Sequence, residues 1–408
     1  MSALFTQPRA AGNAEWRFQF RPAMRDGLRH QPRVPELWTL GGLPRNCPRM
    51  IAPLAKYIDW WAIQFVTMLL PPANGRNLRL EEAVQFLKGP DFIPAESQSR
   101  PVGIEFNPDP AKAGHFRFPT PRPGDFAENN VVYGRLYRCA ERWQERPVIV
   151  LLHGGSDFIN HQFRFPLIAR RCNRAGLNAA TLVLPYHFQR RPRQLVALSS
   201  PDYLRMAEGP AFPFPASRAF SSRNYLRMAE AMSQAIAEIR ALTGWLLGEG
   251  CPAVTLWGFS LGGWLAGLAV CRDARLASVV LTAPGVLFDF PFGERVFRRS
   301  IREAWQGQRV ALETLNLTSL NVTSAQPAIP RENILLIEGI HDLLVRKETV
   351  EELWQAWGRP DIWRLPHGHV SWMGAPGLTG RVLRWLAPRL DAPAATKTVS
   401  RGFPRNAE

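Results

Sequence analysis

Two hydrophobic patterns recur between residues 100 and 390. Short apolar runs bounded by turn residues are typical of buried strands, whereas apolar residues at every third or fourth position are typical of helices. The first pattern predicts strands at 130–139, 147–155, 178–186, 252–259, 277–284, 333–339 and 361–366. The second predicts helices at 163–175, 222–247, 260–270, 347–358 and 380–390.

The alternation of strands and helices predicts an α/β fold, with a mostly parallel sheet covered by helices on both faces. We expect residues 101–390 to form this domain, preceded by an Arg/Pro-rich N-terminal extension at 1–100 and followed by a disordered tail at 391–408. Two segments, 195–222 and 286–332, interrupt the pattern and are predicted to act as lid or cap insertions. Ligands of such sheets bind at the carboxyl ends of the strands.

The extension contains one long apolar stretch, "MIAPLAKYIDWWAIQFVTMLLPP", at 50–72. Lys56 and Asp59 interrupt it, which argues against a helix that spans a membrane. It fits either an amphipathic helix on a lipid surface or a helix packed against the main domain. We favour packing, with Trp60 and Trp61 in the core.

The segment "GFSLG", from Gly258 to Gly262, matches the pattern G-x-S-x-G. It lies between a predicted strand and a predicted helix, where a serine at the apex of a tight turn is a nucleophile. The strained backbone of such a turn requires small residues two positions to either side of the serine. The helix that follows directs its N-terminus at the site and favours developing negative charge. We therefore predict that Ser260 is a nucleophile.

A serine nucleophile needs a base that is oriented by a third group, and in this arrangement acid and histidine follow the serine along the chain. Asp342 comes just after the strand 333–339, and His367 and His369 follow the strand 361–366. Glu338 is an alternative acid, but it lies inside the strand end. Only His369 directly follows a loop glycine, so we predict Asp342 as the acid and His369 as the base.

Four segments, "LLHGGSD", "WGFSLGG", "EGIHDLLV" and "LPHGHVSW", together resemble the α/β-hydrolase superfamily over residues 100 to 390. More narrowly, "LVLPYHFQRRPR", the serine turn Gly258–Gly262 (the elbow) and the region 341–372 are similar to the alpha/beta-hydrolase-domain-containing protein eighteen family. This resemblance implies an α/β-hydrolase fold with Ser260, Asp342 and His369 as the catalytic triad.

The loop "HGGSD" departs from the glycine pattern of that family. An oxyanion would be held by the backbone N–H of Leu261 and by that of either Gly155 or Ser156.

A Ser-His-Asp triad forms acyl-enzymes, so we expect hydrolysis of a carboxylic ester or thioester, without a metal or an organic cofactor. Phenylalanines and arginines in 286–332 suit either a cap that binds a lipid-like ester with an acyl chain and an anionic head, or an ordinary helical insertion with a solvated charged face. A peptidase or amidase would use the same triad. A non-catalytic scaffold or membrane-surface protein would keep the fold but have no need of the triad.

Composition limits the partners. The net charge is +16, and only five of the 50 basic residues are lysine, so the excess is almost entirely arginine. No nucleic-acid-binding motif accompanies this charge, which argues against a nucleic-acid partner, whereas contact with an anionic membrane stays open.

The five cysteines form no CxxC pair, which fits a cytoplasmic protein with no structural zinc or disulfide framework. The pattern does not indicate an oligomeric state.

Overall fold

The computed structural model describes six segments of the chain, all within the compact unit Pro48–Glu408. They are residues 48–68, 103–108, 113–155, 160–192, 222–286 and 318–390. The tail at 391–408, almost all of the predicted lid at 195–222 and residues 287–317 of that at 286–332 lie outside the described residues.

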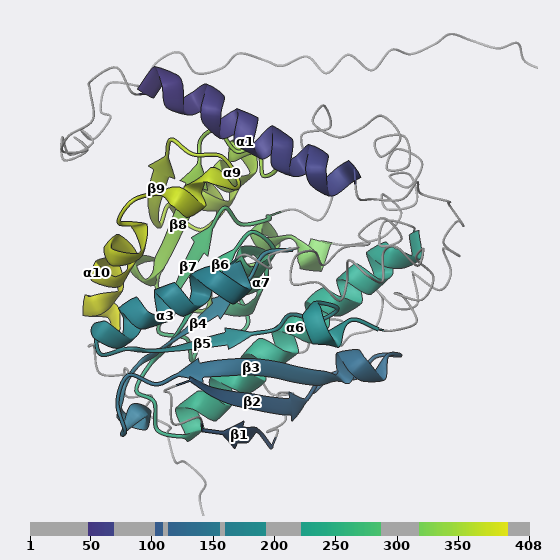
Figure 1. The fold of residues 1–408 in the computed structure, drawn as a ribbon, viewed down its shortest axis with the longest axis vertical. Coiled ribbons are helices and arrows are strands. Elements are labelled where there is room, and N and C mark those ends of the chain that lie inside the picture. Colours follow the sequence, from purple (N-terminus) through teal and green to yellow (C-terminus); the bar gives the residue numbers. More distant parts are fainter. Residues whose placement is uncertain are drawn as a thin grey trace, which may run out of the picture. The chain divides into compact units, whose positions relative to one another are not determined.

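The nine strands of the described segments form a single sheet in the order β1-β2-β3-β5-β4-β6-β7-β8-β9 (Figure 1). Neighbouring strands from β5 to β9 pair in parallel, whereas the pairings among β1, β2, β3 and β5 are antiparallel. From β1 to β9 the strands span Glu105–Asn107, Ala113–Pro119, Val131–Tyr137, Val148–Leu152, Asn178–Leu182, Val254–Phe259, Ser278–Thr282, Ile334–Gly339 and Asp361–Leu365.

All seven predicted strands are present, but the sequence patterns did not reveal β1 and β2. β2 has one buried and one exposed face, with Phe116 and Phe118 inward and His115 and Arg117 outward. Such a strand lacks the continuous apolar run that marks the central parallel strands, because only alternate residues are buried.

Helices cover both faces of the sheet. In β4, Val148, Val150 and Leu152 pack into the core beneath α6, α7 and α9, whereas Ile149 and Leu151 pack beneath α3 and α10. Figure 1 shows α6 and α3 on opposite sides of the strands. The helices span Phe165–Arg174 (α3), Ser222–Gly248 (α6), Leu261–Val270 (α7), Lys347–Ala356 (α9) and Leu378–Leu390 (α10).

This strand order defines the α/β-hydrolase fold, and the predicted fold class is therefore confirmed. Because β4, β6, β8 and β9 run parallel, the loops that follow them meet at one edge of the sheet. That edge is where the candidate site lies.

Helix α1 (Pro48–Met68) belongs to the same compact unit as the sheet. It turns Ala55 and Asp59, one helical turn apart, inward, where each is at most 2% exposed. Trp60 and Trp61 instead are 45% and 52% exposed, so our expectation that they lie in the core is wrong. They are on the opposite side of the helix from the Ala55–Asp59 stripe. No helix in the described segments has the length and apolar character to cross a bilayer.

Candidate active site

Ser260 sits at the turn between β6 and α7 with φ 53° and ψ −114°, a backbone conformation rarely adopted by residues other than glycine. Such strain costs on the order of 1–3 kcal/mol and persists only where the surroundings fix it. Here the Ser260 N–H donates to the Thr282 carbonyl oxygen at 2.9 Å, and its own carbonyl oxygen accepts from the Trp264 N–H at 2.9 Å. The turn is thus tied both to the next strand and to its own helix.

The two glycines of the pattern are required by close backbone approaches. A side chain on Gly258 would overlap the backbone of Gly262 and Gly263 on the other arm of the turn. A side chain on Gly262 would overlap the backbone at the end of β4, with its Cβ only 2.6 Å from the His153 carbonyl oxygen. Backbone atoms cannot yield as a flexible side chain can, so both positions exclude larger residues.

The structure brings Ser260, His369 and Asp342 together in one chain of hydrogen bonds. The Oγ of Ser260 lies 2.9 Å from Nε2 of His369, and Nδ1 of His369 lies 2.8 Å from Oδ2 of Asp342. The Asp342 carboxylate is nearly buried, with 2% of its side chain exposed, and its Oδ1 accepts from the N–H groups of Leu344 and Val345. This geometry holds the histidine with Nδ1 protonated and Nε2 free to accept the serine proton.

The alternative acid, Glu338, and the alternative base, His367, are not members of this chain of hydrogen bonds. Glu338 is buried in β8, with its Oε2 3.4 Å from the Arg364 guanidinium, and burial raises its pKa to about 7. His367 is half-buried, which lowers its pKa, and its carbonyl oxygen accepts from the His341 N–H. The hydrogen-bonded partner of His369 is Asp342, as the spacing predicted.

The loop after β4 lies beside the serine turn. Gly155 is exposed, and a Cβ at that position would be 3.9 Å from the Leu261 side chain. The two backbone N–H groups predicted to hold an oxyanion, those of Leu261 and Gly155, therefore belong to adjacent segments. Ser156, the alternative donor, lies outside the described residues.

His153, which the sequence patterns did not single out, fixes the start of this loop. It is fully buried; its Nδ1–H donates to the Gly154 carbonyl oxygen at 2.8 Å, and its Nε2 accepts from the Leu184 N–H at 3.1 Å. Burial, with His187 nearby, holds the pKa of His153 well below its usual range. A neutral ring with one donor and one acceptor therefore connects the loop after β4 to the chain after β5.

Two further histidines pack against His153. Burial lowers the pKa of His161 and of His187 to about 4. Neither ring nitrogen of His161 has a hydrogen-bond partner among the described residues, and its ring lies 4.6 Å from that of Phe188. The cluster is thus an uncharged aromatic layer beside the loop.

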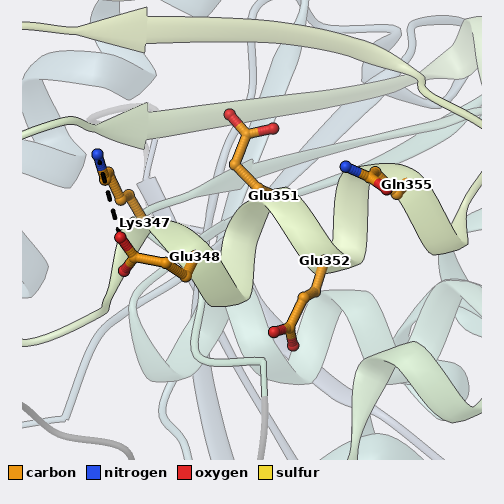
Figure 2. A pocket seen from close by; sticks show the side chains of 5 residues that line it. All are labelled: Lys347, Glu348, Glu351, Glu352 and Gln355. Atoms are coloured by element: carbon orange, nitrogen blue, oxygen red, sulfur yellow. Dashed lines mark ion pairs between the residues drawn. The ribbon is translucent and has the colours of Figure 1, made fainter. Parts of the chain in front are cut away.

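No cluster of three or more histidine, cysteine or acidic side chains in the described segments is arranged to hold a metal ion. Figure 2 shows a surface hollow lined by side chains of α9, namely Lys347, Glu348, Glu351, Glu352 and Gln355. Lys347 and Glu348 form an ion pair there at 4.0 Å. The hollow contains none of the three residues of the hydrogen-bond chain.

No protein-family model matches the chain. The chain is 26% identical over 268 residues to the uncharacterized protein Rv2627c of Mycobacterium tuberculosis, and the match covers 62% of this chain. The chain spans 58% of the length of that relative.

Solved structures with a similar arrangement include an acetyl xylan esterase from Paenibacillus, at a TM-score of 0.47 and 13% identity, covering 79% of this chain and 98% of that one. They also include a Pyrococcus furiosus esterase, at a TM-score of 0.41 and 15% identity, covering 79% and 99% of the two chains. The fold assignment rests on the strand order of this chain.

Proposed function

We propose that this protein is a serine hydrolase that cleaves a carboxylic ester or thioester through an acyl-enzyme. One observation carries the proposal, the chain of hydrogen bonds from Ser260 through His369 to Asp342 at 2.9 and 2.8 Å. A strained serine, an imidazole and a buried carboxylate in this order are the parts that acyl transfer requires. The resemblance to the protein eighteen family is part of the proposal and rests on segments 182–193, 258–262 and 341–372.

The proposal gives each residue a role in the reaction. The Oγ of Ser260 attacks the substrate carbonyl carbon while Nε2 of His369 takes its proton, and the carbonyl oxygen becomes an oxyanion between the N–H groups of Leu261 and Gly155. His369 then returns the proton to the leaving alcohol or thiol, which leaves the acyl group on Ser260. A water molecule, deprotonated by His369, attacks the acyl-enzyme and releases the acid. Asp342 stabilises the imidazolium in both halves of the reaction.

Two other functions use the same fold. A peptidase or amidase would employ the same triad on a poorer leaving group, and is distinguished by its substrates. A scaffold without catalysis would have no need of a strained serine, since about 1–3 kcal/mol of strain serves only a group whose orientation matters. The strain at Ser260 therefore favours an enzyme.

The proposal also includes peripheral contact with an anionic lipid surface. The outer side of α1 exposes four large apolar side chains at 45–58%, those of Leu54, Tyr57, Trp60 and Trp61. Aromatic residues beside positive charge favour the interface of an anionic membrane, and the chain carries a net charge of +16. A lipid-like ester is the substrate class that fits such a location.

The central test is Ser260→Ala. We expect the wild-type protein to react with a fluorophosphonate probe and to hydrolyse p-nitrophenyl acyl esters faster than the matching anilides. The alanine variant should lose labelling and lose activity by several powers of ten, because no other group on the elbow supplies the nucleophile. Faster anilide cleavage by the wild type would indicate an amidase, and a folded variant with wild-type ester hydrolysis would overturn the assignment.

A further inference from the structure

A carboxylate far from the triad in sequence lies against both of the loops that carry His369 and Asp342. Asp59 of α1 is fully buried, and its two oxygens accept three backbone N–H bonds. The donors are Leu343 at 3.2 Å, His369 at 2.5 Å and Val370 at 2.9 Å. One side chain thus joins two loops whose N–H groups lie 284 to 311 positions from it in sequence.

The two loops have little regular structure of their own, so these bonds matter for their shape. Around His369, the Gly368 N–H donates to the Ser371 hydroxyl oxygen, and the next two N–H groups donate to Asp59. After Asp342, one N–H donates to Asp59 and the following two donate to Asp342 itself. Side-chain carboxylates take the place that a helix or strand partner would otherwise fill.

Burial of this carboxylate is costly, and the protein offsets the cost with the three donors. Desolvation raises the pKa of Asp59, and the neighbouring charge of Asp342 raises it further, while the backbone N–H bonds act against this rise. Replacement of Asp59 by an apolar residue would leave three backbone N–H groups without this acceptor. Two of these groups belong to His369 and the residue after it, and the third to the residue after Asp342, so one carboxylate bonds to the backbone of both loops.

Gly368 provides an independent sign of the same contact. A Cβ at this position would lie 2.5 Å from Cγ and 2.6 Å from Oδ1 of Asp59, so only glycine leaves room for the carboxylate. This glycine is the residue that distinguished His369 from His367 in the sequence. The structure therefore gives its physical reason, which is the approach of α1.

We propose that Asp59 is a positioning residue that sets the orientation of His369 and Asp342 relative to Ser260, an inference that rests on the proposed hydrolase function. Helix α1 is then a working part of the active site, although none of its residues lies in the hydrogen-bond chain. The loops after β8 and β9 reach their working geometry only when this helix is in place.

The test compares Asp59→Asn with Lys56→Gln, an exposed substitution on the same helix. The asparagine is nearly isosteric, but its NH₂ group would face a backbone N–H where the carboxylate had an acceptor oxygen. We expect kcat for a p-nitrophenyl ester to fall about a hundredfold with KM nearly unchanged, because a small misplacement of a catalytic group has that effect. The downfield proton signal of the His369–Asp342 hydrogen bond should weaken, and Lys56→Gln should alter neither measurement.

Gly368→Ala serves as a second variant, because its methyl group disturbs the same contact from the other side. A folded Asp59→Asn or Gly368→Ala enzyme with wild-type kcat overturns the proposal. Failure of both variants to fold also overturns it, since Asp59 would then be a stabilising core residue rather than a positioning one. The proposed function fails separately, through wild-type ester hydrolysis by Ser260→Ala, whatever the Asp59 variants do.

Discussion

The Oγ of Ser260 and Nε2 of His369 lie 2.9 Å apart, but different contacts hold the two residues in place. The serine lies between a strand and a helix that are its immediate neighbours in sequence, and Gly258 packs against the other arm of the same turn. The Ser260 N–H also donates to Thr282 of the next strand. The histidine and its acid lie on two loops that are joined by Asp59, which comes from a helix near the other end of the described chain.

The difference shows how local and distant contacts divide the work of one site. A strained turn can be encoded locally, because backbone contacts within it decide which side chains fit. Two loops that follow separate strands share no local contacts that fix their relative orientation. A third element that hydrogen-bonds to both loops fixes that orientation, and α1 is this element.

The two loop histidines provide the largest expected effect. His369→Ala should lower kcat by several powers of ten, because only its Nε2 reaches the Ser260 hydroxyl. His367→Ala should keep a substantial fraction of the activity, since this side chain is not in the hydrogen-bond chain. Steady-state kinetics of both variants, with circular dichroism to confirm folding, would check this. A greater loss of activity in His367→Ala than in His369→Ala would assign the base to His367. The comparison of the serine turn with the loops of His369 and Asp342 would then have no basis.

The elbow should be intolerant of a single methyl group. Gly262→Ala places its Cβ against the backbone at the end of β4, and we expect a loss of about 3 kcal/mol in the free energy of unfolding. Gly248→Ala, in a helix position with no atom within 4 Å of the added Cβ, is the matched control and should be neutral or slightly stabilising. Urea denaturation measures both. Equal stabilities would show that the backbone at the end of β4 does not exclude a side chain at position 262.

Acid should weaken the part of the molecule beside the elbow. The pKa values of His161 and His187 fall from 6.5 to about 4 on folding, so the unfolded chain binds more protons between those values. The stability they provide is complete above pH 6.5 and is lost as the pH falls towards 4. His161→Phe should therefore gain about 2 kcal/mol relative to wild type at pH 5 but little at pH 7.5.

The gain in free energy of unfolding is best measured as the difference between His161→Phe and wild type. The titration of Glu338 changes the stability of both proteins with pH in the opposite direction. Its pKa rises from 4.5 to about 7 on folding, so its contribution is present below pH 4.5 and is lost as the pH rises through 7. Thermal melts of His161→Phe and wild type at both pH values give the result. A parallel shift at the two pH values would mean that His161 titrates normally.

The smallest effect on stability is expected on the outer side of α1. Trp61→Glu should change the free energy of unfolding by no more than about 0.5 kcal/mol and leave hydrolysis of a water-soluble ester intact, because Trp61 is half exposed. If this side meets anionic lipid, the variant should float less with anionic vesicles, and wild-type flotation should weaken as salt rises. A large loss of stability would contradict the division of α1 into a bonded inner side and a free outer one. Equal flotation of both proteins would count against lipid contact.

The sequence by itself determined the sheet and the elbow. The central strands are buried on both faces and therefore read as apolar runs, and Gly258 meets a steric demand that arises within the turn. The order of strands also placed Asp342 and His369 at the same edge as Ser260, because parallel strands end together. The hydrophobic patterns do not predict β1 and β2, because these strands are short or only half buried.

Only the tertiary structure decided what Asp59 and His153 do. In the sequence, Asp59 is recognisable only as a charged residue that interrupts an apolar stretch, and His153 only as a residue of a glycine-rich loop. The donors to Asp59 and the Leu184 N–H that donates to His153 lie 31 to 311 positions away, and no periodicity connects residues so distant. A pattern records which face of an element is buried, whereas the partner that meets a buried polar group depends on how the elements pack.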